Sequence, residues 1–348
     1  MRNRFIKGMI GVLLFFLLLS GCLFGPEGKE SSPIDPPPKS SEKKEQSSEK
    51  SKDQADSSDA KGSLELYFLT DTGYVVPYAL NIPKVEGIAK EALDYMVKGG
   101  PAQSMLPEGF SGILPKGTEV KGLDIQKGTA TIDFSKEFLS YDPGMEEKIL
   151  SAVTWAVTGF DSVNKVNIWV DGRPLETMPK KKSPAQELTR DRGINLEIAQ
   201  GVKASQSMPV TLYFLGQTEE DEVYYVPVTR MIDRQKNVAK AALTELVKGP
   251  QHGSDLVNAL VDTTEINSVQ IKGDTAVADF GKQLLEYSDE KKASQDALNT
   301  IVLSLTENTS AKKVKITVEG EGETAAKTLG DPFDKPVTRP KRINPVAF

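Results

Sequence analysis

Hydrophobic residues in the first half of the chain occur in short runs and periodic sets that predict alternating strands and helices. The stretch 64–69 is a run of apolar and aromatic residues typical of a strand, and the segment 74–77 is expected to return beside it. Apolar residues then recur at helical spacing. The positions that predict this first helix are Ile88, Ala92, Leu93 and Met96. Gly99-Gly100-Pro101 is expected to end the helix.

The pattern continues with a predicted hairpin, a second helix and a closing strand. The segments 123–126 and 129–134 flank Lys127-Gly128, which is a hairpin signal. The second helix is indicated by Leu150, Val153 and Val157, and the closing strand by 165–170. The order ββαββαβ, with one apolar face on each helix, predicts a two-layer α+β sandwich.

The same pattern occurs a second time. Leu-Tyr-Phe-Leu at 66–69 returns at 212–215, and five further blocks follow in the same order with offsets between 146 and 150. These blocks begin at 74, 89, 97, 129 and 165 in the first copy and at 224, 239, 247, 275 and 313 in the second. The sequence therefore predicts two tandem domains at 63–180 and 209–332, joined by a polar linker at 181–208 and followed by a tail at 333–348.

The N-terminus predicts export and lipid attachment. A basic start is followed by an apolar run of about 12 residues, which suits a signal peptide better than a bilayer crossing of about 20. Leu19-Ser20-Gly21-Cys22 then resembles a bacterial lipobox. We expect residues 1–21 to be removed by cleavage between Gly21 and Cys22, and Cys22 to carry the lipid. The simpler alternative is a short anchoring helix with an incidental cysteine.

Residues 22–62 predict a disordered tether. The segment is rich in Ser, Lys, Glu, Asp and Pro and has few large apolar residues, so it cannot bury enough surface to offset its ordering entropy. Its r.m.s. reach is roughly 35 Å. We therefore expect the folded domains to be held near the outer face of a bacterial cytoplasmic membrane by lipidated Cys22.

Composition narrows the classes of function. The net charge is −6 over 348 residues, and removal of the three cations before Gly8 makes it about −9, which disfavours nucleic acid as a partner. One cysteine excludes an intramolecular disulfide, and one histidine, His252, leaves little for zinc or histidine-based catalysis. We expect no metal and no cofactor, and His252 at the surface of a loop.

Two short patterns resemble catalytic motifs and are explained more simply. The segment 109–112, Gly-Phe-Ser-Gly, approaches the Gly-x-Ser-x-Gly pattern of a nucleophile elbow, but Ile113 occupies the position of the second glycine. The segment also lacks the strand-to-helix setting of that motif, so we predict a turn. Ser-x-x-Lys occurs at 162–165 and at 310–313. In both copies the serine follows a helix and the lysine precedes a strand, which predicts a solvated turn rather than an acyl-enzyme site.

Acidic residues offer no catalytic pair. Asp133 and Asp279 occupy matched positions at a strand end, where alternation directs them outward to bond a loop or contact a partner. Neither has a second acid at a matched position, as a glycosidase pair requires. Glu146 and Glu147 have no equivalent in the second copy. We therefore predict that the protein is not an enzyme and has no catalytic residues.

The matched blocks resemble the GerMN (sporulation and spore germination) domain family. The resemblance rests on the Leu-Tyr-Phe strands, the Val-Lys-Gly blocks at 97 and 247, the strands at 129–134 and 275–280, and the closing strands that end in Asp-Gly or Glu-Gly. It implies a lipoprotein of an endospore-forming bacterium that acts in sporulation and germination. It also implies a fold resembling the ring-building motif, without catalytic residues.

Two functions are compatible with the sequence. The first is a structural component of an extracytoplasmic complex at the septum between mother cell and forespore, where two modules add avidity to contacts with other sporulation membrane proteins. The second is binding or hydrolysis of spore cortex peptidoglycan. A solute-binding lipoprotein is less well supported, because two domains joined by one linker do not resemble a hinged cleft.

Overall fold

The computed structural model describes residues 63–83, 87–285, 293–319 and 335–345. The predicted signal peptide, Cys22 and the predicted tether lie outside the described residues. The elements of the first repeat are β1 (Ser63–Thr70), β2 (Val75–Asn81), α1 (Ile88–Tyr95), β3 (Phe110–Gly112), β4 (Val120–Gln126), β5 (Thr129–Phe134), α2 (Glu146–Val157), β6 (Lys165–Val170) and β7 (Arg173–Pro174).

The second repeat follows a short connecting strand, β8 (Glu197–Ile198). Its elements are β9 (Ser207–Gln217), β10 (Val223–Asp233), α3 (Val238–Lys248), β11 (Ile266–Lys272), β12 (Thr275–Phe280), α4 (Gln295–Asn308), β13 (Lys313–Val318) and β14 (Val337–Thr338). The α+β class is therefore confirmed, and the predicted strands and helices occur in the predicted order in both repeats, with β3, β7 and β14 in addition.

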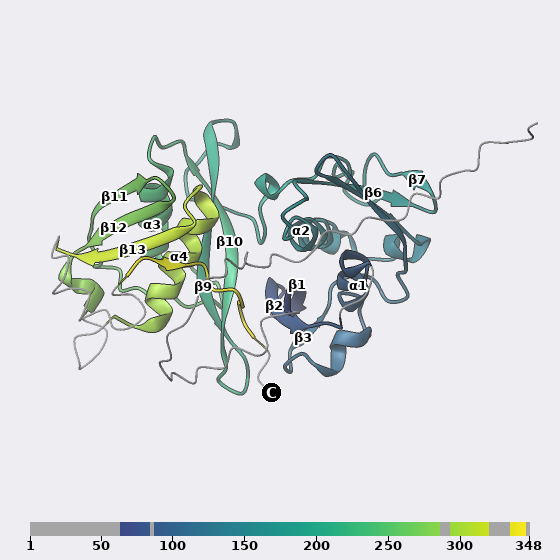
Figure 1. Ribbon diagram of the computed structural model, residues 1–348, viewed down its shortest axis with the longest axis horizontal. Helices are drawn as coiled ribbons and strands as arrows, with labels where there is room; N and C mark the ends of the chain where they lie inside the picture. Colours follow the sequence, from purple (N-terminus) through teal and green to yellow (C-terminus); the bar gives the residue numbers. More distant parts are fainter. Residues whose placement is uncertain (1–62, 84–86, 286–292, 320–334, 346–348) are drawn as a thin grey trace, which may run out of the picture. The chain divides into compact units, whose positions relative to one another are not determined.

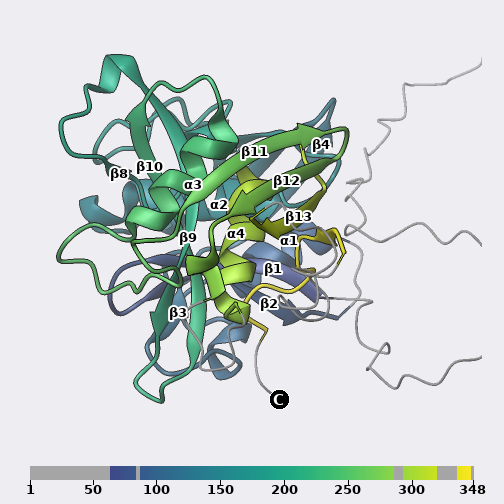
Figure 2. The same ribbon diagram turned by 90° about the vertical axis from the view of Figure 1, so that its left-hand side faces the viewer.

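Each repeat contains a hairpin sheet, a helix layer and a four-stranded sheet. The hairpins are β1–β2 and β9–β10, and the four-stranded sheets have the orders β4-β5-β6-β7 and β11-β12-β13-β14. In Figure 1, α3 and α4 lie between the second hairpin and β11–β13. Figure 2 shows β11, β12 and β13 side by side. The hairpin therefore adds a layer to the two that the sequence predicts.

This extra layer changes how the helices are buried. Helices with one apolar face were expected, but α2 and α4 are buried around most of their circumference. The reason is that each contacts a hairpin strand, β1 or β9, as well as a strand of the four-stranded sheet. Small residues of α4, such as Thr300 and Ser304, are fully buried, and their hydroxyls bond to backbone groups.

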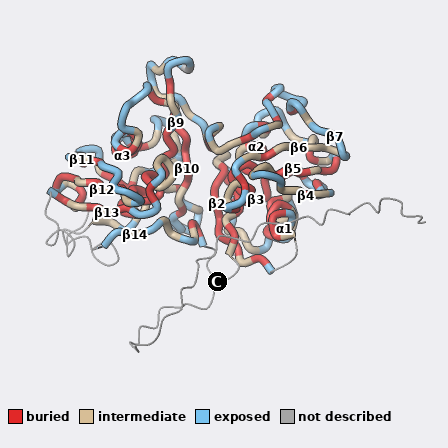
Figure 3. Tube along the Cα trace, turned by 45° about the horizontal axis from the view of Figure 1, so that its top comes forward, coloured by how far each residue is buried: buried red, intermediate tan, exposed pale blue. Residues whose placement is uncertain are grey.

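The hairpin strands are buried on both faces. Leu66, Tyr67 and Phe68 are each at most 1% exposed, although successive side chains of a strand point to opposite faces. In Figure 3, β2 and β9 are likewise largely buried. Contact between β2 and β10 supplies part of this cover. A strand covered on both faces reads as a continuous apolar run, which accounts for the repeated Leu-Tyr-Phe-Leu.

The first three strands of the four-stranded sheets repeat in detail. Strands β5 and β6 pair in parallel from Thr129↔Lys165, and β12 and β13 pair in parallel from Thr275↔Lys313. A register irregularity follows Val120 in β4 and Ile266 in β11, at matched positions 146 residues apart. A retained bulge of this kind shows that the two copies share backbone geometry as well as apolar pattern.

The predicted turn at 109–112 is wrong. Phe110–Gly112 forms β3, which pairs antiparallel with the end of β1, and Leu114 then forms a bridge with Val97. The local sequence does not indicate this strand, because the strand with which it pairs lies about 40 residues earlier in the chain. In the second repeat the matched position, Val257, makes a single bridge to Leu215.

Gly112 provides a test of this packing. A Cβ at this position would lie 2.3 Å from the backbone oxygen of Val97, whereas a Cβ at Gly122 in β4 would meet no atom within 4 Å. We expect Gly112→Ala to lower the free energy of unfolding by about 2 kcal/mol because the backbone at Val97 must move. Gly122→Ala should change it by less than about 0.5 kcal/mol. Urea unfolding of both variants measures this difference. Equal changes in the free energy of unfolding would contradict the close contact between Gly112 and Val97.

Candidate functional site at the junction of the repeats

The structure places the Ser-x-x-Lys pairs in exposed turns. Ser162 follows α2 and Ser310 follows α4, and both are exposed. Lys165 forms a surface ion pair with Glu187, with the amine nitrogen 3.1 Å from the carboxylate oxygen. The matched Lys313 faces Asp274 at 3.6 Å. The prediction of solvated helix-to-strand turns is confirmed.

The matched aspartates bond to neighbouring loops and strands. The Asp133 carboxylate accepts a hydrogen bond from the backbone N–H of Gly172 at 2.9 Å. Asp279 accepts from the Thr317 hydroxyl at 2.6 Å and from the Asn267 amide at 3.0 Å. The predicted loop-bonding role is therefore found at Asp133, and a strand-bonding role at Asp279. His252 is exposed in its loop, as expected.

Glu146 is fully buried, which the sequence does not indicate. Its carboxylate accepts hydrogen bonds from the backbone N–H groups of Lys180, Lys181 and Ser183 and from the Tyr141 hydroxyl, at 2.8 to 3.2 Å. Burial alone would raise the pKa of this carboxyl, but the hydrogen bonds outweigh burial and lower the pKa to about 2. The charge fastens the segment that leaves the first repeat.

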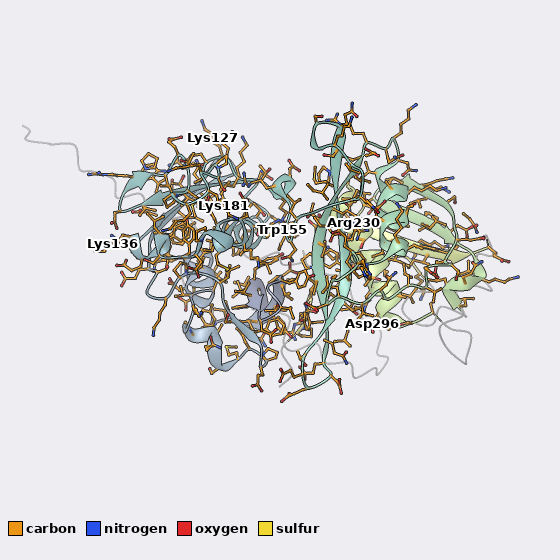
Figure 4. All side chains as sticks on the ribbon, turned by 180° about the vertical axis from the view of Figure 1, so that it is seen from behind. Lys127, Lys136, Trp155, Lys181, Arg230 and Asp296 are labelled. Carbon is orange, nitrogen blue, oxygen red and sulfur yellow. The ribbon has the colours of Figure 1, made fainter. Side chains whose placement is uncertain are left out.

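A buried ion cluster joins the connecting strand β8 to the second repeat. Arg230 of β10, labelled in Figure 4, is 4% exposed and donates to Glu197 on β8 and to Glu245 on α3. A third bond runs to the backbone oxygen of Gly249 at 2.8 Å. Arg230 thereby fixes the connecting strand and the end of α3 to the hairpin.

The residues that join the two repeats converge on Glu307, near the end of α4. The Glu307 carboxylate lies 3.0 Å from the guanidinium of Arg190 and 3.1 Å from that of Arg339. Arg190 lies in the segment after the first repeat and Arg339 in the segment after the second. Burial would raise the pKa of the Glu307 carboxyl, but the positive charges of Arg339 and Arg190 outweigh burial and hold the pKa below its ordinary value.

Each arginine also caps the long helix of its own repeat. Arg190 donates to the backbone oxygen of Trp155 at 3.1 Å and to the Thr158 hydroxyl at 2.9 Å, and it stacks on the Trp155 ring. Arg339 donates to the matched groups, Leu303 O and the Thr306 hydroxyl, each at 3.4 Å. A cation at these positions neutralises the carbonyl ends of α2 and α4.

Two matched tyrosines complete the junction. Tyr213 donates to Glu307 at 3.3 Å and accepts a hydrogen bond from Arg339 at 2.6 Å. Tyr67, 146 positions earlier, packs edge-on against Trp155 and donates to Glu65. Burial raises the pKa of both tyrosine hydroxyls, so both remain neutral donors. The position in the first repeat that matches Glu307 is Gly159, so one carboxylate serves both arginines.

A groove with a cavity volume of about 480 Å³ borders this cluster. Its lining includes Glu65, Glu307, Arg190, Arg339, Lys341 and Arg342. Because Arg190 and Arg339 both bond to Glu307, these groups hold the junction together. In the described residues no three His, Cys, Asp or Glu side chains are placed to hold a metal ion. No helix in the described part of the chain is long and apolar enough to cross a membrane.

The fold and junction define a tandem α+β protein whose repeats are fastened by buried charges. The family model for sporulation and spore germination, named Germane, matches residues 65–176 and 211–324. The chain belongs to this family. It is 38% identical to the spore germination protein GerM of Bacillus subtilis (strain 168), with 95% of each chain covered. The solved tandem GerMN domains of that sporulation protein match with a TM-score of 0.75 at 39% identity, covering 82% of this chain and 99% of the other.

The junction arginines are not evident from the sequence pattern. Arg190 lies within the predicted linker and Arg339 within the predicted tail, so both lie outside the two predicted domains. A usable signal existed, because the two arginines are separated by 149 positions, close to the offset of the matched blocks.

The charge of Glu307 should contribute strongly to stability. Glu307→Gln leaves two largely buried guanidinium groups without a countercharge, so we expect the free energy of unfolding to fall by about 3 kcal/mol. Glu187→Gln makes the same chemical change in an exposed pair and should cost less than about 1 kcal/mol. Denaturant unfolding of both variants measures the contrast. Equal costs would show that the junction does not depend on this charge.

Glu146 should contribute a pH-dependent stability. Because folding lowers its pKa from 4.5 to about 2, its contribution is complete above pH 4.5 and is lost as the pH falls toward 2. Glu146→Gln should cost about 3 kcal/mol at pH 7 and should flatten the acid limb of the stability curve. Its exposed neighbour is the control, since Glu147→Gln should leave the free energy of unfolding at pH 7 and the acid limb of the stability curve nearly unchanged. Urea unfolding between pH 2.5 and 7 tests this, and an unaltered acid limb in Glu146→Gln would refute it.

Proposed function

We propose that the chain is a lipid-anchored protein required for sporulation and germination, which acts by assembly rather than by catalysis. The observation that carries the proposal is the match to the spore germination protein GerM along 95% of both chains. The sequence Leu19-Ser20-Gly21-Cys22 supports attachment through Cys22, and the polar segment at 22–62 supports a tether.

The proposed site of action is the extracytoplasmic face of the membrane at the sporulation septum, with other extracytoplasmic sporulation membrane proteins as partners. Duplication supports an assembly role. The buried junction makes the repeats one body, so two equivalent surfaces are presented together and the second contact benefits from a high effective concentration.

The outward faces of the four-stranded sheets are the surfaces that we propose for partners. The hairpins are covered on both faces, whereas strand positions such as Thr131 in β5 and the matched Val277 in β12 remain half-buried. Asp133 and Asp279 occupy the next outward positions on the same strands, where their carboxylates hold neighbouring backbone and side chains in place.

A crosslinked pull-down from sporulating cells tests the proposal. We expect the chain to capture other membrane proteins of the septum, and Cys22→Ser to lose them together with membrane retention. A Cys22→Ser chain carrying an unrelated transmembrane anchor in place of residues 1–21 should recover both the partner proteins and the retention on the membrane. The double variant Thr131→Arg, Val277→Arg should lose the partners while remaining on the membrane, and Glu108→Arg, in an exposed loop, should keep them.

Other outcomes would overturn the assembly role. Recovery of wall fragments or lytic enzymes without membrane partners would favour the peptidoglycan alternative. Co-sedimentation of the protein with purified spore peptidoglycan, or release of muropeptides from it, would support that alternative directly.

A further inference from the structure

The repeat extends beyond the blocks that define it. After each closing strand the chain carries an eight-residue segment, Leu-Thr-Arg-Asp-Arg-Gly-Ile-Asn at 188–195 and Val-Thr-Arg-Pro-Lys-Arg-Ile-Asn at 337–344. We name these the first and second closing segments. Their arginines, isoleucines and asparagines are all separated by 149 positions (339 − 190, 343 − 194 and 344 − 195). The shared form is Thr-Arg-x-x-x-Ile-Asn.

The asparagine of the first closing segment bonds to both hairpins. Asn195 accepts a hydrogen bond from the backbone N–H of Val75 at 2.8 Å. Its amide nitrogen donates to the backbone oxygen of Val75 and to that of Pro227, both at 2.7 Å. Val75 belongs to β2 of its own repeat, and Pro227 belongs to β10 of the other.

The asparagine of the second closing segment makes the matched bonds. Asn344 accepts from the backbone N–H of Tyr225 at 2.7 Å and donates to the oxygen of Tyr225 at 2.9 Å and of Pro77 at 2.8 Å. Tyr225 matches Val75 and Pro77 matches Pro227, each with an offset of 150. Both asparagines have a positive φ, 48° and 51°, a conformation that asparagine adopts more readily than most residues.

The ends of the segments cover the edge of the opposite hairpin. Ile194 accepts a backbone hydrogen bond from Thr229 of β10 at 2.8 Å, and β8 then continues parallel to β10. Ile343 accepts the matched bond from Ala79 of β2 at 3.1 Å, and Pro345 then forms a parallel bridge with Ala79. Both isoleucines are 1% exposed.

These contacts repeat under exchange of the two copies. Each closing segment starts on the long helix of its own repeat through its arginine, crosses between the hairpins at its asparagine, and ends on the edge strand of the other repeat. The arrangement has the reciprocity of an isologous dimer interface with exchanged segments, here contained in one chain.

We propose that the edge of β2 together with the start of β10 at Tyr225 is a docking site for segments of the form Thr-Arg-x-x-x-Ile-Asn. Its occupant is the second closing segment of the same chain. Docking makes the C-terminus of the second repeat a structural part of the first, and it covers an edge strand that would otherwise be open to pairing with another chain.

The docking can be tested in the folded, full-length protein. A protease recognition sequence is placed in the connection 320–334, and the chain is cut after folding. We expect the cut segment to stay bound and to exchange with a fluorescent peptide of residues 335–348, which raises the anisotropy of the peptide. A peptide with Asn344→Ala should bind at least about 10-fold more weakly, because buried backbone groups lose their partner.

A matched peptide controls for general loss of contact. Lys341→Ala removes an exposed side chain from the same segment and should change the affinity less than about 2-fold. Equal binding of the Asn344→Ala and unaltered peptides would overturn the proposal. The proposal would also be overturned if the cut segment were released and the free energy of unfolding of the remaining protein stayed the same.

If the cut protein unfolds, hydrogen exchange in the uncut chain gives a second measurement. Asn344→Ala should speed exchange at the amides of Tyr225 and of Ala79, although Ala79 lies in the first repeat, and Lys341→Ala should not. Faster exchange confined to the second repeat would show that the segment does not support β2.

Discussion

A hairpin that is buried on both faces needs two covers, and this requirement organises the whole protein. The helix layer covers one side of β1 and β2, and the contact between β2 and β10 together with the closing segments supplies cover on the other. One repeat therefore leaves apolar strand surface and unpaired edge groups exposed. Duplication meets this requirement within one polypeptide, because each copy completes the hairpin of the other.

Polar interactions then decide how the two copies are aligned. Apolar burial is non-directional, so it does not select one register between β2 and β10. The amides of Asn195 and Asn344 and the shared carboxylate of Glu307 do select one, because each must satisfy several buried partners at once. The assembly role that we propose relies on the resulting rigid spacing of the two outer sheets.

The sequence predicts those parts of the fold that depend on local periodicity. The runs at 64–69 and 129–134 and the helical spacing of Leu150, Val153 and Val157 are local signals, and their repetition reinforces each of them. Strand β3 and the buried Glu146 depend on partners distant in sequence, so a window of 10 to 20 residues cannot reveal them. The closing segments were missed because four shared residues among eight are too few to stand out without the contacts that they make.

The shared carboxylate has a consequence for the relation between the two repeats. Glu307 neutralises Arg190 and Arg339, while the equivalent place in the first repeat holds Gly159. Two copies of the first repeat would set two guanidinium groups against each other with no anion between them, whereas two copies of the second would supply one carboxylate for each guanidinium. The two halves are therefore not interchangeable, because the first repeat depends on the second for the anion that its arginine requires, and the dependence runs in one direction only.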